Sequence, residues 1–309
     1  MIFLRTLLIS TVLLIAACGG EDRQASNDDL SATESKNALV VVSNYPLYFF
    51  ASRIAAGVDV APEIVFPDID GDPASWTPNA EQIQLLQSAD VVILNGAGAE
   101  PWLDLITIDR RRLLDTSVGF TDRLIPLEGA VAHQHGPEGE HSHQGTAFTT
   151  WLDPQLAIAQ AHVVTIELIE LAPTGEKLFR DNLAKLQQEL MELDSQLAKA
   201  FARIDGKAVL FSHPVYQYLQ RRYGINGESV HWEPREEPTT SAWIALQRIL
   251  ATHPATIMIW EDEPLSSTAE RLSNTGIAII PFRTAANWPE EGDYFSVMRE
   301  NVERLEIAR

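Results

Sequence analysis

The chain has 309 residues and a formal net charge of −20 at pH 7, from 43 acidic and 23 basic side chains. This excess of negative charge repels the phosphates of nucleic acids, so we expect no nucleic-acid partner. The only cysteine excludes a disulfide framework, and the chain beyond residue 37 is long enough for two domains.

The N-terminal segment is typical of an exported lipoprotein. Arg5 precedes an apolar run that stops at Ile15-Ala16-Ala17-Cys18. The run is too short to span a bilayer, and the small residues before the cysteine resemble the lipobox that lipoprotein signal peptidase cleaves. We expect residues 1–17 to be a signal peptide, Cys18 to carry lipid, and the polar residues 18–37 to form a flexible tether. The alternative is an ordinary signal peptide with an incidental cysteine.

Short apolar runs alternate with amphipathic stretches from residue 38 onward. Strands are expected at residues 38–43, 61–66 and 90–95, and helices at residues 45–56 and 79–88. Buried strands between helices predict an α/β layer with a parallel sheet. A low-complexity loop follows at residues 132–145 and contains His133, His135, His141 and His143.

A long helix separates this first half from a second one. Residues 154–172 predict a helix, and the stretch from Glu176 to Asp205 is amphipathic and contains neither Gly nor Pro. A single helix of that length spans about 40 Å at 1.5 Å per residue, which suits a rigid connection. The alternation then restarts, with strands at 207–212, 228–232, 256–260 and 277–282 and helices at 215–223, 240–253, 266–275 and 293–308.

The predicted fold is α/β, a clamshell of two doubly wound lobes at residues 38–172 and 206–309, joined by one long rigid helix within residues 173–205. Ligands of such sheets bind beyond the carboxyl ends of the strands. Those ends place Asp72 in the first lobe, and His213, His231, Glu233 and Glu261 in the second.

Several motifs along the chain carry a family resemblance. They are Tyr45-Pro46-Leu47-Tyr48, residues 89–102 (ADVVILNGAGAEPW), Trp151-Leu152-Asp153-Pro154, residues 218–224 (YLQRRYG), Glu263-Pro264 and residues 292–301 (GDYFSVMREN). In this order and spacing they resemble the metal-type solute-binding proteins of ABC importers, the zinc and manganese group that includes ZnuA- and TroA-like proteins. The resemblance implies a two-lobed fold, a divalent metal as cargo and an ABC permease as partner.

The chain departs from the family where the metal ligands lie. Ala74 and Thr149 occupy two positions where the resemblance implies histidine, and Arg283 lies near the position of a fourth, carboxylate ligand. His213 matches the third histidine and is retained. A rebuilt site could combine His213 with His231, Glu233, Glu261 or Asp72, since imidazole and carboxylate suit zinc and manganese accepts more oxygen. Each of these residues could instead be structural.

Two alternatives stay open for the cargo. Five tryptophans fall near strand ends, and aromatic walls with acidic partners bind organic cations, although they could equally pack the lobes: Trp76, Trp102, Trp151, Trp232 and Trp260. The His-rich loop could also scavenge zinc by itself, because neutral imidazoles bind it.

The motifs of enzymes are missing from the sequence. It contains no nucleophile elbow, phosphate-binding glycine loop or HExxH motif, so we expect no enzymatic activity. The sequence as a whole predicts a monomeric lipoprotein, anchored to a membrane and facing the periplasm or cell exterior, that captures zinc in preference to manganese and delivers it to an ABC permease.

Overall fold

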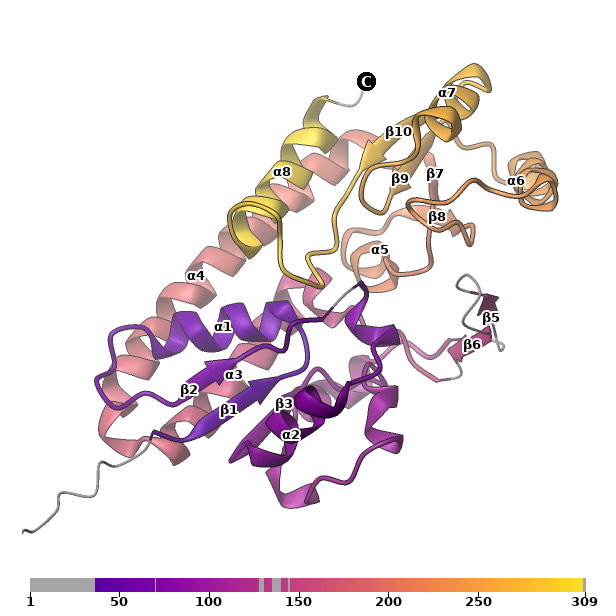
Figure 1. Ribbon diagram of the computed structural model, residues 1–309. Helices are drawn as coiled ribbons and strands as arrows, with labels where there is room; N and C mark the ends of the chain where they lie inside the picture. The colour runs from indigo at the N-terminus through magenta and orange to yellow at the C-terminus, as the bar shows by residue number, and fades with distance from the viewer. Residues whose placement is uncertain (1–36, 70, 128–130, 135–139, 144, 308–309) are drawn as a thin grey trace, which may run out of the picture. The chain divides into compact units, whose positions relative to one another are not determined.

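The computed structural model describes residues 37–69, 71–127, 131–134, 140–143 and 145–307 (Figure 1), with only the backbone described for 131–134 and 140–143. Residues from Asn37 onward form one compact unit. The expected signal peptide, the lipidated Cys18 and all but the last residue of the tether lie outside the described residues, as does His135. Among the helices that are described, none combines the length and apolar character that a bilayer span requires.

The first half is built on a parallel sheet of four strands in the order β2-β1-β3-β4. The strands are β1 (Leu39–Val42), β2 (Glu63–Val65), β3 (Val91–Leu94) and β4 (Leu113–Asp115), and the helices are α1 (Tyr45–Ala55), α2 (Ala80–Ser88) and α3 (Pro154–Leu171). Every side chain of β3 is buried, as expected for a strand covered on both faces. Asn44 begins α1 because its Oδ1 accepts a hydrogen bond from Leu47 N at 3.0 Å.

The second half repeats this architecture with a parallel sheet in the order β10-β9-β7-β8. Its strands are β7 (Ala208–Phe211), β8 (Asn226–Ser229), β9 (Ile257–Trp260) and β10 (Ala278–Pro281). Its helices are α5 (Gln217–Tyr223), α6 (Thr240–Thr252), α7 (Ser266–Asn274) and α8 (Tyr294–Ile307). The predicted α/β class and the two-sheet architecture are confirmed.

Short 3₁₀ helices lie in the segments that connect the strands and α-helices. They are η1 (Pro73–Ser75), η2 (Pro101–Asp104), η3 (Arg110–Arg112), η4 (Thr116–Arg123), η6 (Thr150–Leu152), η7 (Pro173–Gly175) and η8 (Ala202–Ile204).

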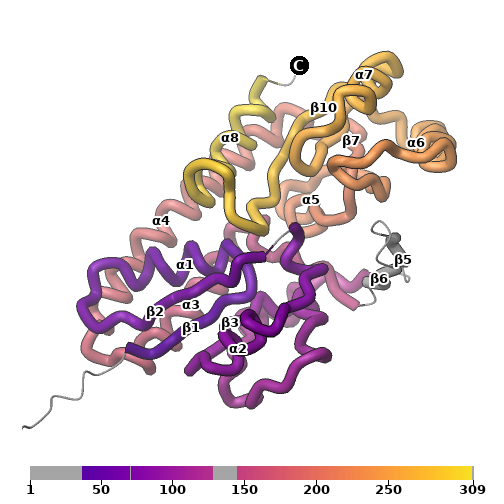
Figure 2. Tube along the Cα trace, viewed as in Figure 1, coloured from indigo at the N-terminus to yellow at the C-terminus, as the bar shows by residue number. Residues whose placement is uncertain are grey.

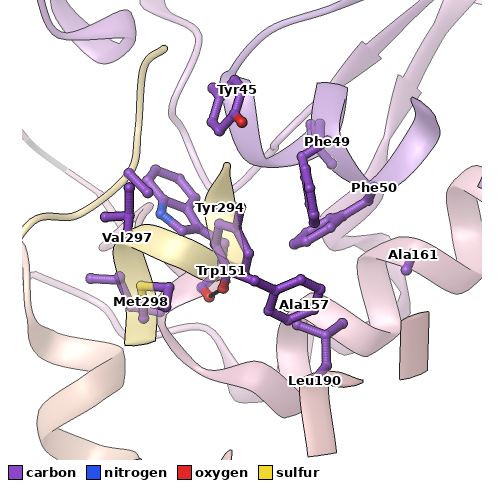
Figure 3. Packing of buried hydrophobic residues seen from close by; sticks show 14 of the residues in the cluster. Tyr45, Phe49, Phe50, Trp151, Ala157, Ala161, Leu190, Tyr294, Val297 and Met298 are labelled. Atoms are coloured by element: carbon purple, nitrogen blue, oxygen red, sulfur yellow. Dashed lines mark hydrogen bonds between the residues drawn. The ribbon is translucent and has the colours of Figure 1, made fainter. Parts of the chain in front are cut away.

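The long helix α4 (Glu176–Phe201) packs against α1 and α3 of the first half and against α5 and α8 of the second (Figure 2). Its buried face carries Leu183, Leu186, Leu190, Leu193 and Leu197. Aromatic rings of α1 and α8 meet beside it, with Phe50 and Tyr294 centroids 5.3 Å apart (Figure 3). The two halves therefore share one continuous hydrophobic core as well as the connecting helix.

Three strand assignments differ from the sequence-based expectation: the position of β8, the presence of β4, and the strand pair within the His-rich loop. Strand β8 begins at Asn226 and not at residue 228, because Gly227 pairs with Val209 and packs under Phe211. A Cβ at Gly227 would lie 2.2 Å from the Phe211 ring, so only glycine fits there. The short strand β4 was not expected. Within the His-rich loop, β5 (Val131–Gln134) and β6 (Glu140–His143) form an antiparallel pair with His133 opposite His141 in register.

A partly buried ion-pair network joins three helices at the C-terminal half of α4. The carboxylate of Asp194 accepts hydrogen bonds from Arg222 and from Tyr223 Oη of α5, the latter at 3.0 Å. It also accepts one from Gln155 Nε2 of α3 at 3.0 Å. Asp194 thus links helices of both halves.

Replacing Asp194 with alanine should lower the free energy of unfolding by roughly 1–3 kcal/mol, because Arg222 and Tyr223 would lose their acceptor in a partly buried setting. Urea denaturation followed by circular dichroism measures this loss. The matched control is Asp181→Ala on the same helix, which breaks an exposed pair with Lys177 and should cost less than about 1 kcal/mol. Equal losses in the two variants would contradict the assigned role.

Candidate metal centre

Two of the expected site residues, His213 and Glu261, follow the two strands at the switch point of the second sheet. Strand order reverses between β7 and β9, which are direct neighbours. His213 comes two residues after the end of β7 and Glu261 directly follows β9. Glu261 N donates to Ser212 Oγ at 2.9 Å, which ties the two strand ends together. Crevices at such switch points are where open α/β sheets bind ligands.

His213 lies close to one of the expected carboxylates. Its side chain is buried, with 9% of its surface exposed, and Nδ1 lies 3.8 Å from Oε1 of Glu233. This separation is too long for a hydrogen bond, and it makes an ion pair only with a protonated imidazole. His213 and Glu233 therefore come together as expected, whereas His231 is exposed at the surface.

Glu261 is a buried carboxyl group with a raised pKa. Burial first, and then the nearby carboxylates of Asp72 and Glu233, raise its pKa to about 8, against the lowering effect of a hydrogen bond from Thr284 Oγ1 at 3.4 Å. The coupling to Asp72 matters because Asp72 belongs to the first half of the chain. Three carboxyl groups from both halves thus crowd one region, and their mutual repulsion disfavours full ionisation.

Asp72 is an exposed residue at the start of η1, where its Oδ1 accepts a hydrogen bond from Ala74 N at 2.9 Å. It lines a small pocket together with residues of both halves, which are Ser43, Asn44, Pro73, Ala74, Ala99, Glu100, Phe148, Trp151 and Ala286. Ala74, where the resemblance implies histidine, is buried in the wall of this pocket.

The clustered side chains are not arranged around a common point. Within the part of the chain that the structure describes, no three His, Cys, Asp or Glu side chains are placed to hold a metal ion together. A cation in this cluster therefore requires the side chains of His213, Glu233, Glu261 and Asp72 to turn toward one another. The backbones of His133, His141 and His143 are described, but their side chains are not, and His135 lies outside the described residues.

Two positions that the resemblance associates with metal ligands have other contacts here. Thr149 Oγ1 donates to Val215 O at 2.5 Å, so this hydroxyl ties the start of η6 to the segment after β7. Arg283 pairs with Glu300 of α8, and its backbone is held by both ends of the Asn301 side-chain amide. The Thr149 hydroxyl and the Arg283 guanidinium are thus both engaged by protein groups.

Glu100 is a pocket residue that the sequence analysis did not single out. Its Oε1 accepts hydrogen bonds from Ser43 Oγ at 2.6 Å and Asn95 N at 2.7 Å, and its Oε2 accepts one from Gly96 N at 3.2 Å. Burial raises its pKa to about 7 in spite of these bonds. An acid directly after the Gly96-Ala97-Gly98-Ala99 turn was the available signal. Gly96 has φ +74°, and a Cβ there would lie 1.8 Å from Asp115 Oδ1.

The five tryptophans of the organic-cation alternative are all buried. Trp232 packs on Trp243 and Trp260 in the core of the second half, and the guanidinium of Arg271 lies 3.9 Å from the Trp243 ring centre. Trp151 donates its Nε1 hydrogen to Thr284 O at 2.8 Å. These rings pack the lobes, and Trp151 is the one of the five that also lines the small pocket beside Asp72.

Comparison with known proteins identifies the family. The family model described as zinc-uptake complex component A, periplasmic, matches residues 40–308. The chain belongs to this family. The high-affinity zinc uptake system protein ZnuA of Bacillus subtilis is 22% identical over 303 residues, covering 95% of this chain and 93% of that protein. The manganese-binding lipoprotein MntA of Halalkalibacterium halodurans is 25% identical over 229 residues, covering 73% and 69%.

Other relatives are longer than this chain. The zinc-binding protein AdcA of Streptococcus pyogenes is 25% identical over 307 residues, which cover 89% of this chain but 58% of AdcA.

Among solved structures, the metal-dependent lipoprotein YcdH of Bacillus subtilis superimposes with a TM-score of 0.71 at 20% identity, covering 87% of this chain and 98% of YcdH. That likeness confirms the fold. The relatives carry the names of uptake and metal-binding proteins, in agreement with the expectation that the chain is not an enzyme.

The crowded carboxyl groups predict how stability depends on pH in the absence of metal. The pKa of Glu261 rises from 4.5 to about 8, so the folded chain binds more protons than the unfolded chain between these values. Stability should therefore fall as pH rises from about 5 to 8 and level off above that range. Glu100, whose pKa is raised to about 7, acts in the same direction.

Urea unfolding in the presence of a chelator, at about pH 5, 7 and 9, measures this dependence. Glu261→Gln should lose less stability than the unmodified chain over this range, because its amide does not ionise. The exposed Glu228 of β8 provides the control, since Glu228→Gln should retain the full pH dependence. An unchanged slope in Glu261→Gln would show that Glu261 ionises normally.

Proposed function

We propose that this protein is the metal-binding lipoprotein of an ABC importer, and that it captures zinc between its two halves. The observation that carries the proposal is the convergence of Asp72, Glu233 and Glu261 beside His213. A divalent cation neutralises the repulsion that raises the Glu261 pKa, and it displaces the proton that this group otherwise holds. Family membership supports metal as the class of cargo.

The ligand chemistry favours zinc over manganese by affinity. One imidazole with carboxylates is a regular zinc set, and sites made of nitrogen and oxygen ligands bind zinc more tightly than manganese. The oxygen-rich composition leaves manganese as the second candidate, in line with the name of the MntA relative. Competition between the two ions distinguishes them, with zinc expected to displace manganese.

Delivery to a membrane permease completes the proposal. A lipid on Cys18 and the polar residues that follow would hold the binding unit beside a permease, so that capture and transfer stay local. The monomeric state belongs to the same proposal, since one unit with its two halves supplies all the suggested ligands. The proposal keeps the domain limits expected from the sequence, which are residues 38–172, 173–205 and 206–309. In the order of the chain, α4 lies in the middle segment.

The metal site is tested by calorimetry and metal analysis on the chain from Gly19 onward. His213→Ala should weaken zinc binding by about 100-fold or more, because even losses in the outer shell of a metal site cost about 10–100-fold. The control is His162→Ala, which removes an exposed histidine on α3 and should leave affinity unchanged.

Deletion of residues 132–145 separates the cleft from the His-rich loop. Tight binding that survives the deletion but not His213→Ala supports the cleft. If zinc binding is lost on deletion of the loop but unchanged in His213→Ala, the loop alone scavenges the metal. If neither metal binds the loop-deleted chain at micromolar levels, the cleft proposal fails.

The anchor is tested by Cys18→Ser in the full chain. The variant should lose lipid labelling and move from the membrane fraction to the soluble fraction, because the thiol is the proposed attachment point. Ser26→Ala, a change in the polar tether, should leave fractionation unchanged. Membrane association that persists in Cys18→Ser would contradict a lipid anchor at this residue.

A further inference from the structure

Residues 284–288, which we call the strap, follow β10 and reach the first half of the chain. At the near end, Thr284 Oγ1 donates to Glu261 Oε1 at 3.4 Å, and Thr284 O accepts from Trp151 Nε1 at 2.8 Å. Ala285 has φ +56°, an unusual conformation for a residue other than glycine. This turn directs the following residues across to α1, where Ala286 O accepts a hydrogen bond from Tyr45 N at 3.2 Å.

Asn287 clamps the loop that carries Asp72. Its Nδ2 donates one hydrogen to Ile69 O at 2.8 Å and the other to Gly71 O at 2.7 Å. Its Oδ1 accepts from Trp288 N at 2.8 Å, so the whole side-chain amide is used. Gly71 directly precedes Asp72, and fixing its carbonyl restricts where the Asp72 carboxylate can lie.

Trp288, at the far end of the strap, packs against aromatic rings of the first half. Its ring centroid lies 5.0 Å from Tyr45, 4.7 Å from Tyr48 and 5.8 Å from Phe66, all in the first half. It is also the one tryptophan of the seven in the chain that is exposed, with 47% of its surface accessible. The strap therefore contacts Glu261 at one end and the Asp72 loop and its aromatic neighbours at the other.

We propose that Asn287 is a positioning residue that holds the Asp72 loop across from Glu261 and thereby sets the affinity of the cation site. Asp72 and the ionised form of Glu261, which a bound cation requires, repel each other, and the paired hydrogen bonds of Asn287 hold the Asp72 loop against that repulsion. The inference rests on the proposed function, because it assigns a metal site to the same cluster.

The test is a double-mutant cycle on zinc affinity, measured by calorimetry with the chain from Gly19 onward. Asn287→Ala should weaken zinc binding by about tenfold, as expected for loss of a group that orients a ligand. In an Asp72→Ala background, Asn287→Ala should have no further effect, because the ligand that it positions is already gone. Asn287→Leu keeps the side-chain volume without the donors and should behave like the alanine variant.

Asn182 of α4 provides a matched control. Its Nδ2 also donates to two backbone carbonyls, Ile54 O at 3.0 Å and Ala56 O at 2.8 Å, at the end of α1. Asn182→Ala likewise loses two side-chain hydrogen bonds to backbone carbonyls and should leave zinc affinity unchanged.

Three results would overturn the inference. Unchanged affinity in Asn287→Ala and Asn287→Leu, with zinc binding otherwise intact, removes the role of Asn287 alone. An equal loss in the Asp72→Ala background shows a general structural effect and no positioning of Asp72. An unmodified chain that binds no zinc overturns the proposed function, and the inference with it.

Discussion

The packing of α4 against helices of both halves is the constraint on which the rest of the structure depends. Its leucine face and the rings of Phe50 and Tyr294 join the two sheets through a single core, and Asp194 adds an ion pair between α4 and α5. The ends of β7 and β9 are thereby held in range of Asp72, which lies in the other half of the chain. A cation site made from both halves needs this fixed relation, because each half supplies only part of the ligand set.

This fixed arrangement of the two halves also holds several acidic side chains close together. Burial, together with the nearby carboxylates of Asp72 and Glu233, raises the pKa of Glu261 to about 8, and the chain as a whole has an excess of negative charge. Hydrogen bonds from Thr284 and Asn287 hold these groups where they are. Crowded carboxylates of this kind favour a functional interpretation, since a bound cation relieves the repulsion that the fold otherwise sustains.

The alternation of strands and helices predicted the fold well, because buried parallel strands and amphipathic helices have distinct periods. α4 was predicted for the same reason. Strand β8 begins two residues earlier than predicted because the contact between Gly227 and Phe211 joins separate strands, and a local pattern does not reveal it.

The gathering of Glu233 and Glu261 near His213 followed from their places after parallel strands. Asn287 and Glu100 were missed because their roles depend on partners such as Gly71 and Ser43, which are distant in sequence. Ala74 and Thr149, at positions where the resemblance implies histidine, were visible in the sequence, whereas the contact of Thr149 with Val215 was not.

Anomalous diffraction at the zinc absorption edge, from crystals of the chain grown with one equivalent of zinc, tests the cation site most directly. The account predicts one strong peak beyond the carboxyl ends of β7 and β9, within coordination distance, about 2.0–2.2 Å, of His213 and of carboxylate oxygens from both halves. A peak confined to the His-rich loop, or a zinc site that includes neither His213 nor Asp72, would contradict it.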